Sequence, residues 1–284
     1  MSAQIISGRE VAEQIRQELK PRVDKLKEKG VVPGLAAVLV GEDPASLSYL
    51  RGIAKGCEKV GIFTETVSLP PNITQWELEG KVEELNKNTK FHGIIIQRPL
   101  SQQIDEGAVL KLLSPEKDVD CLNPLSMAKL VTRETGGFAP CTPSAVIELL
   151  DRYHVEIDGK RAVIVGGAGN IGRTVGIMLL NRWATVILCD YKTVRPAEEY
   201  RRAEILVSVV GKAKLITRDM VNRGTVVIDV GVSMGEDGKL SGDVDFDAVS
   251  EVAGMITPVP GGVGAVTTTI LLAHTVEAAE RLNK

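Results

Sequence analysis

Residues 161–190 read RAVIVGGAGNIGRTVGIMLLNRWATVILCD, and this stretch decides the fold of the second half of the chain. A short apolar run at 162–165 predicts a buried parallel strand. A glycine-rich turn follows, and a helical pattern of apolar residues follows the turn. A second apolar run at 184–189 predicts another strand, which ends at the acid Asp190. This order of strand, turn, helix, strand and acid is typical of a dinucleotide-binding βαβ unit.

The glycine spacing gives this prediction a physical basis. Gly167, Gly169 and Gly172 fit the pattern G-x-G-x-x-G. The first glycine permits a tight turn, the second leaves room for a pyrophosphate, and the third lets helix and strand pack closely. The helix N-terminus offers free N–H groups and a partial positive charge to the phosphates. Asp190 is suited to accept both hydroxyls of an adenine ribose, which favours NAD. The alternative is a glycine-rich turn that binds no ligand.

The predicted cofactor-binding set extends beyond the glycines to the first helical turn and to a later strand end. It comprises Gly167, Gly169, Asn170, Ile171, Gly172, Arg173, Asp190 and Gly211.

Length and composition restrict the class of protein. The 284 residues suffice for two domains that each bury a core. A formal net charge of −3 gives no reason to expect a nucleic acid or an anionic membrane as partner. No apolar run reaches transmembrane length, and the N-terminal residues lack a signal-peptide pattern. The four cysteines include no C-x-x-C pair. We therefore expect a cytoplasmic protein with reduced thiols and no metal site.

Apolar runs alternate with helical patterns along the chain, which predicts an α/β protein with mainly parallel sheets. Strands are predicted at 35–40, 64–69, 92–97, 162–165, 184–189, 205–209 and 226–230, and helices at 7–29, 47–60, 74–88, 105–113, 144–153 and 267–282. Residues 41–46 are predicted to form a loop, and residues 235–242 a loop or hairpin. We expect two α/β domains, one of residues 1–141 completed by the helix at 267–284, and a Rossmann-type domain of residues 142–266.

Loop motifs carry a resemblance along essentially the whole chain. They are GEDPAS with Tyr49, GIIIQRPL with Gln97, KDVD ending at Asp120, PCTP at 140–143, VIDVG at 227–231, GDVDF at 242–246 and TPVPGGVG at 257–264. In this order they resemble the methylenetetrahydrofolate dehydrogenase/cyclohydrolase family of the FolD type. The resemblance implies a folate substrate, a folate cleft between the two domains and a homodimer.

The resemblance also implies roles for individual residues. Tyr49, Gln97 and Asp120 are expected to form the catalytic and folate-binding site, in which the Asp120 carboxylate pairs with N–H groups of the pterin. The loop of Pro260, Gly261, Gly262 and Val263 is expected to close over substrate and cofactor. Taken singly, Tyr49, Gln97 and Asp120 would favour structural roles as a core tyrosine, a strand-end amide and a loop-capping acid.

The chain departs from the family pattern at three places. Ile53 stands where the catalytic lysine is usual, and Lys55 lies on a different side of the same helix. The usual G-R-S turn is replaced by one that contains Gly167, so the arginine and serine that help to bind an NADP 2′-phosphate are missing. Asp190 brings a carboxylate to the place of that phosphate. A like charge repels NADP and therefore favours NAD.

These departures lead to a specific hypothesis, an NAD-dependent methylenetetrahydrofolate dehydrogenase with weak or absent cyclohydrolase activity. Hydride transfer requires mainly positioning of the two reactants. Hydrolysis of the methenyl product requires proton transfer, which Ile53 cannot provide. Two alternatives stay open at this point. One is a bifunctional enzyme that hydrolyses without the usual lysine, and the other is a catalytically weak NAD- and folate-binding regulatory protein.

Overall fold

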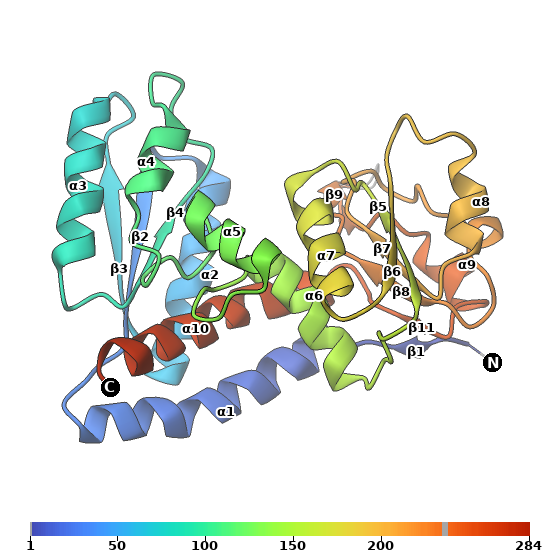
Figure 1. The fold of residues 1–284 in the computed structure, drawn as a ribbon, viewed down its shortest axis with the longest axis horizontal. Helices are drawn as coiled ribbons and strands as arrows, with labels where there is room; N and C mark the ends of the chain where they lie inside the picture. The colour runs from blue at the N-terminus through green and yellow to red at the C-terminus, as the bar shows by residue number, and fades with distance from the viewer. Residues whose placement is uncertain (1, 235–237) are drawn as a thin grey trace. The chain divides into compact units, whose positions relative to one another are not determined.

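The computed structural model describes residues 2–234 and 238–284, which form two compact units whose elements are labelled in Figure 1. Unit 1 contains the residues up to Ala12 together with Thr142–Thr267, and unit 2 contains Glu13–Cys141 and Thr268–Lys284. The expected grouping of the N-terminal residues with the rest of 1–141 was wrong. Strand β1 (Gln4–Ile5) pairs with β11 (Met255–Ile256), and this pairing ties the start of the chain to unit 1.

Unit 2 is built on a three-stranded parallel sheet in the order β3–β2–β4. The strands are β2 (Gly34–Val40), β3 (Phe63–Leu69) and β4 (Gly93–Ile96). Alternate residues of β2 and β4 enter one apolar core with residues of α3 (Gln75–Lys87) and α4 (Glu106–Leu112), as the two-residue period of a strand requires. The unit also contains α2 (Pro44–Val60) and α5 (Pro124–Thr132). Helices α1 (Gly8–Glu28) and α10 (Val263–Leu282) contribute residues to both units.

Unit 1 is built on a six-stranded sheet in the order β1–β11–β8–β7–β5–β6, and every pairing in it is parallel. Its remaining strands are β5 (Arg161–Val165), β6 (Thr185–Cys189), β7 (Ile205–Ser208) and β8 (Val226–Asp229). Its helices are α6 (Cys141–Arg152), α7 (Asn170–Asn181), α8 (Pro196–Arg201) and α9 (Phe246–Ser250), with a short 3₁₀ helix at Arg218–Met220. The chain runs from β5 to β6 on one side and continues with β7 on the other side of β5. This arrangement is the topological switch point of a doubly wound fold.

Helix α2 begins at Pro44, so the prediction of a loop over the whole of 41–46 was wrong. Asp43 caps this helix by accepting the N–H of Ser46 at 2.8 Å, and proline suits the first helical position. The predicted hairpin is present as β9 (Ser233–Met234) paired with β10 (Leu240–Ser241). Its residues 235–237 lie outside the described part of the chain.

Two carboxylates are buried at the carboxyl-terminal edge of the unit 1 sheet. Asp229, at the end of β8, is 3% exposed, and Asp243 is fully buried. Burial raises the pKa of Asp229 to about 7, and the negative charge of Asp243 adds to the effect. Backbone N–H groups of Val244 and Asp243 oppose this rise in pKa by stabilising the ionised form. The buried pair therefore holds an additional proton below neutral pH.

This proton makes the stability of the fold depend on pH. An unfolded aspartate ionises near pH 4, whereas Asp229 in the folded chain ionises near pH 7, so the stabilisation is complete at low pH and is lost as the pH rises through 7. We expect the free energy of unfolding to fall by about 1.4 kcal/mol between pH 6 and pH 8. Urea unfolding at these pH values measures the slope. Asp229→Asn should flatten it, and equal slopes for both proteins would contradict the assignment.

Candidate functional site

The glycine turn of unit 1 connects β5 to α7. The N–H groups of Gly166 and Gly167 both donate to the carbonyl of Cys189 at 2.9 Å, which fixes the turn to the end of β6. Gly169 is the N-cap of α7, and its lack of a side chain leaves the first turn of the helix without a side-chain cap. The N–H groups of this first turn are therefore available to an anion.

Close packing explains why the turn is made of glycine. A Cβ on Gly172 would lie 2.3 Å from the carbonyl oxygen of Gly166, and one on Gly167 would lie 2.6 Å from the Cβ of Leu188. A Cβ on Gly169 would meet only the oxygen of Gly166, at 3.4 Å, so space over the turn is open. This tight turn with open space beside a helix N-terminus fits the pyrophosphate of a dinucleotide.

Asp190 lies next to this turn. Its Oδ2 accepts the N–H of Ala168 and its Oδ1 the N–H of Tyr191, both at 2.8 Å. These two contacts lower the pKa of Asp190, so the side chain is ionised at neutral pH. A carboxylate has about four acceptor positions, and two of them therefore stay available for ribose hydroxyls. The Nζ of Lys192 lies 5.6 Å from the centre of the Tyr191 ring.

The loop after β7 forms a second wall beside the glycine turn. A Cβ on Gly166 would lie 2.7 Å from the carbonyl oxygen of Val209, so the two loops touch. Gly211, in the same loop, has a φ of +78°, which favours glycine. The glycine turn, Asp190 and Gly211 thus gather at the carboxyl ends of β5, β6 and β7, where open α/β sheets bind their ligands.

Arg173, Asn170 and Ile171 belong to the first turn of α7. The guanidinium of Arg173 donates to the carbonyl of Ala168 at 2.8 Å and so braces the turn from the helix side. The structure therefore brings the predicted cofactor-binding residues together within unit 1.

In unit 2, Tyr49 and Gln97 lie near the start of α2. The Nε2 of Gln97 donates to the Oγ of Ser46 at 3.3 Å, which links the end of β4 to the first turn of α2. Tyr49 is 42% exposed. Desolvation of its hydroxyl, together with the charge of Asp120, nevertheless raises its pKa, so the phenol stays protonated at neutral pH. Tyr49 is therefore suited to donate a hydrogen bond and to contact a ring.

Asp120 is half-buried and oriented by the start of α6. Its Oδ1 accepts the N–H of Cys141 at 2.9 Å. The preceding acid, Asp118, is fully buried and accepts the N–H groups of Leu122 at 2.7 Å and of Asn123 at 2.9 Å. Asp118 thus fixes the loop that carries Asp120. The KDVD motif predicted a role only for its second acid, Asp120, and none for Asp118.

Cys141 and His274 are neighbours but lack the features of a catalytic pair. The Sγ of Cys141 lies 3.9 Å from the Nδ1 of His274, and both atoms contact the carbonyl of Val119, at 3.4 and 2.8 Å. Burial raises the pKa of the thiol and lowers that of the imidazole. An uncharged buried thiol is a poor nucleophile, so these contacts hold α10 against the loop of Asp120.

The usual lysine position is apolar and buried. Ile53 is 1% exposed and lies one helical turn after Tyr49, on the same face of α2. Lys55 is exposed to solvent. No proton-transferring side chain therefore stands at position 53.

The predicted substrate loop of Pro260, Gly261, Gly262 and Val263 lies in unit 1. The carbonyl of Gly261 accepts the N–H of Arg9 at 3.2 Å, at the start of α1. The loop thus belongs to a different unit from Tyr49, Gln97 and Asp120.

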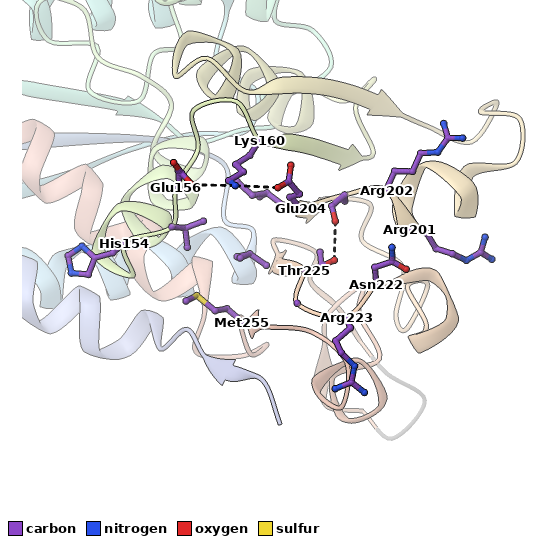
Figure 2. A pocket seen from close by; sticks show the side chains of 15 residues that line it. His154, Glu156, Lys160, Arg201, Arg202, Glu204, Asn222, Arg223, Thr225 and Met255 are labelled. Carbon is purple, nitrogen blue, oxygen red and sulfur yellow. Dashed lines mark hydrogen bonds and ion pairs between the residues drawn. The ribbon is translucent and has the colours of Figure 1, made fainter. Parts of the chain in front are cut away.

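A cavity of about 580 Å³ opens at the opposite edge of the unit 1 sheet, where Lys160, Glu204 and Thr225 precede β5, β7 and β8. Figure 2 shows Lys160 between Glu156 and Glu204, with its Nζ 3.3 and 3.4 Å from their carboxylates. The labelled arginines of Figure 2 do not converge on one point of the cavity. Despite its volume, the cavity therefore lies apart from the carboxyl ends of β5, β6 and β7, where the glycine turn, Asp190 and Gly211 gather.

Within residues 2–234 and 238–284, no group of three or more His, Cys, Asp or Glu side chains is arranged to hold a metal ion. In this described part of the chain, no helix has both the length and the apolar character needed to span a bilayer.

The comparisons with known proteins cover both units. Residues 6–120 match the family model described as tetrahydrofolate dehydrogenase/cyclohydrolase, catalytic domain. Residues 140–283 match the NAD(P)-binding domain of the same description. The bifunctional protein FolD of Bacillus thuringiensis is 49% identical over 281 residues, which cover 99% of this chain and 98% of the relative.

Solved structures agree with these matches. The bifunctional FolD of Campylobacter jejuni is 41% identical, with a TM-score of 0.96 over 99% of this chain and 100% of that one. The FolD of Trypanosoma brucei, described in complex with NADP and an inhibitor, is 39% identical, with a TM-score of 0.93 and 99% of each chain covered.

The close packing of Gly172 against Gly166 leads to a prediction. Gly172→Ala should weaken dinucleotide binding about tenfold or more and destabilise the fold by about 1–3 kcal/mol, because its Cβ meets backbone that cannot move aside. Gly176→Ala is the matched control in the same helix, since its Cβ meets side-chain atoms and no backbone, the Cδ2 of Leu188 at 2.7 Å and the Cγ1 of Val186 at 3.4 Å. NADH fluorescence titration measures both variants. Equal affinities would show that the turn tolerates a side chain at Gly172.

Proposed function

Because the chain belongs to the tetrahydrofolate dehydrogenase/cyclohydrolase family, we propose that it oxidises 5,10-methylenetetrahydrofolate to 5,10-methenyltetrahydrofolate with NAD as hydride acceptor. The observation that carries the NAD assignment is the ionised carboxylate of Asp190 beside the glycine turn. When NAD is bound, its nicotinamide ring would accept the hydride. The residues of the chain bind and orient the two reactants, and the folate nitrogens stabilise the cation that forms.

The choice of NAD over NADP rests on charge. The relative from Trypanosoma brucei is described with NADP, and the matching family model is described as NAD(P)-binding, so the family alone does not decide the cofactor. In this chain an adenosine 2′-phosphate beside the glycine turn would meet the negative charge of Asp190. The ribose diol of NAD would instead donate two hydrogen bonds to the same carboxylate.

The Asp190 carboxylate makes cofactor preference testable. We expect NAD to be preferred over NADP by on the order of 30-fold or more in kcat/KM, from charged hydrogen bonds of ~1.5–3 kcal/mol each. Asp190→Asn keeps the shape and removes the charge, and should narrow the preference about tenfold. Lys192→Met, next to the site, is the control for a general change of surface charge. Gly167→Arg is unsuitable as a partner substitution because of the contact with Leu188. Equal use of both cofactors by the unaltered protein would refute the assignment.

We assign folate binding to Tyr49, Gln97 and Asp120. Two observations support this assignment. The charge of Asp120 contributes to the raised pKa of Tyr49, and Gln97 is hydrogen-bonded to Ser46 at the start of α2. Asp120 keeps acceptor capacity beyond its contact with Cys141, which suits the N–H groups of a pterin. Assignment of Pro260, Gly261, Gly262 and Val263 to substrate binding is supported by the family motif. These intact residues argue against a catalytically weak binding protein.

We further propose that cyclohydrolase activity is weak or absent. Hydrolysis requires a group that moves protons between water and the folate, and such catalysis typically contributes ~10²–10⁴-fold. Ile53 is buried and apolar, and Lys55 is exposed. A second candidate function is favoured by the relatives, whose name is bifunctional protein FolD. In that case water ordered by Gln97 and Asp120 would replace the lysine.

The Ile53 proposal predicts accumulation of the methenyl product during turnover. The unaltered protein should hydrolyse added methenyltetrahydrofolate at close to the buffer rate while it retains dehydrogenase activity, because Ile53 transfers no proton. Loss of absorbance by the methenyl compound measures this rate. Ile53→Lys should raise hydrolysis, and Ile53→Met is the apolar control. Hydrolysis by the unaltered protein about 100-fold or more above buffer would establish the bifunctional alternative instead.

We infer a homodimer formed through unit 1. Strand β6 is an end of the sheet, and no further strand of the described residues lies beside it. Large apolar side chains are exposed on β6 and near the end of α7, among them Leu188, Leu180 and Trp183. An unpaired strand edge with an exposed apolar patch favours association. Sedimentation of the purified chain should show a dimer, and Trp183→Glu should weaken this dimer. If the unaltered protein is a monomer, the inference of a homodimer is wrong.

A further inference from the structure

The buried acids Asp229 and Asp243 have no part in the sites described above. Both lie at the carboxyl-terminal edge of the unit 1 sheet, Asp229 at the end of β8 and Asp243 shortly after β10. Among the described residues, no Lys or Arg forms an ion pair with either acid. Their charge is therefore compensated by hydrogen-bond donors, and the identity of these donors indicates what the acids do.

Asp243 holds the loop that follows β7. Its Oδ2 accepts the hydroxyl of Ser208 at 2.8 Å and the N–H of Val210 at 2.7 Å. Its Oδ1 accepts the N–H groups of Gly211 and Lys212, both at 2.8 Å. Three successive backbone N–H groups that point at one carboxylate form an anion-binding turn, and here the anion belongs to the protein itself.

Asp229 in turn holds the segment that carries Asp243. Its Oδ1 accepts the N–H groups of Gly231 at 3.0 Å and of Asp243 at 3.1 Å, and its Oδ2 accepts the N–H of Val244 at 2.9 Å. A Cβ on Gly231 would lie 2.0 Å from the Oδ1 of Asp243, and one on Gly242 would lie 2.0 Å from the Oδ2 of Asp229. The motifs VIDVG and GDVDF therefore interlock through two carboxylate–glycine contacts.

The loop held by Asp243 is the wall of the crevice opposite the glycine turn. Strands β5 and β7 are adjacent (Figure 1), and open α/β sheets bind ligands in the crevice outside the carboxyl ends of two such strands, at the switch point of the sheet. The carbonyl of Val209 packs against Gly166, so a shift of this loop changes the width of the crevice. The N–H groups of Val210, Gly211 and Lys212 are already bonded to Asp243, which leaves carbonyl groups and the exposed Val210 side chain to face a ligand.

We propose that Asp243 is a positioning residue for dinucleotide binding, which acts by holding the loop of Val210, Gly211 and Lys212 in its binding conformation before the cofactor arrives. This inference rests on the dinucleotide-binding function proposed above. Asp243 is fully buried and its oxygens already accept four hydrogen bonds, so we assign it no part in the chemistry. A loop that is already ordered loses less conformational freedom when the ligand binds, and binding is tighter for that reason.

Amide hydrogen exchange on the unaltered protein tests the contacts directly. The amides of Val210, Gly211 and Lys212 should exchange slowly without NADH, and NADH should change them little. The amides of the first turn of α7 should become protected only when NADH is added. Rapid exchange of the three loop amides in the free protein would overturn the proposal, because the cofactor rather than Asp243 would then order the loop.

Asp243→Asn tests the consequence for binding, since an amide NH₂ replaces an acceptor that faces N–H donors. We expect the Kd for NADH and the KM for NAD to rise about tenfold, with kcat at saturating NAD and the KM for methylenetetrahydrofolate changed by less than about twofold. Asp118→Asn is the matched control in unit 2, because it alters an equally buried carboxylate that also accepts backbone N–H groups. It should leave the Kd for NADH unchanged and raise the KM for the folate.

The outcomes separate this inference from the function on which it rests. A lack of NADH binding by the unaltered protein would overturn the dinucleotide assignment itself. Unchanged NADH affinity in Asp243→Asn would overturn only the role of Asp243. An equal rise of the NADH Kd in Asp118→Asn would show general destabilisation, and would also overturn that role.

Discussion

The close approach of backbone to backbone at the glycine turn constrains the rest of unit 1. The carbonyl of Gly166 lies where a Cβ on Gly172 would have to stand, and the N–H groups of Gly166 and Gly167 are bonded to the end of β6. This geometry joins the start of α7, the end of β5 and the end of β6 in one small volume. A helix N-terminus that is fixed so closely to strand ends presents its N–H groups to an anion without reorganisation. Asp190 then adds a fixed negative charge at one side of that volume.

The loops that carry the proposed sites share one device, a carboxylate that accepts backbone N–H groups. Asp190 binds the glycine turn, Asp243 binds the loop after β7, and Asp118 binds the loop before α5. Loops have few neighbouring strands to satisfy their N–H groups, so an acid side chain replaces the missing partners. Because a charged acceptor forms stronger bonds than a neutral one, each loop gains order, and at the buried Asp243 and Asp118 this order comes at the cost of a desolvated charge. Where two such acids meet, as Asp229 and Asp243 do, burial together with the charge of Asp243 raises the pKa of Asp229.

The sequence was informative where local pattern and topology agree. The strand, glycine turn, helix and acid at 161–190 follow from apolar periodicity and glycine spacing, and the structure contains them in that order. The sequence pattern did not predict the start of α2, because Pro44 in a Gly- and Asp-containing stretch is also typical of a loop, although aspartate before proline is a helix N-terminus signal as well. Strand β1 was grouped with the wrong unit because its partner β11 is far away in sequence. The pairing of Asp229 with Asp243 likewise depends on tertiary packing, which a single motif does not reveal.

Two of the three departures from the family pattern act on different properties because they stand in different units. Ile53 lies in α2 of unit 2 and concerns proton transfer to a folate, whereas Asp190 lies at the end of β6 in unit 1 and concerns recognition of a ribose. Neither change requires the other, since the two residues belong to separate compact units. A buried isoleucine leaves hydride transfer chemically intact, because that step needs position more than proton exchange. An acid beside the glycine turn leaves the pyrophosphate contacts intact, because those come from backbone N–H groups. Cofactor preference and hydrolysis can therefore change independently on this fold, and each has to be argued from its own residues.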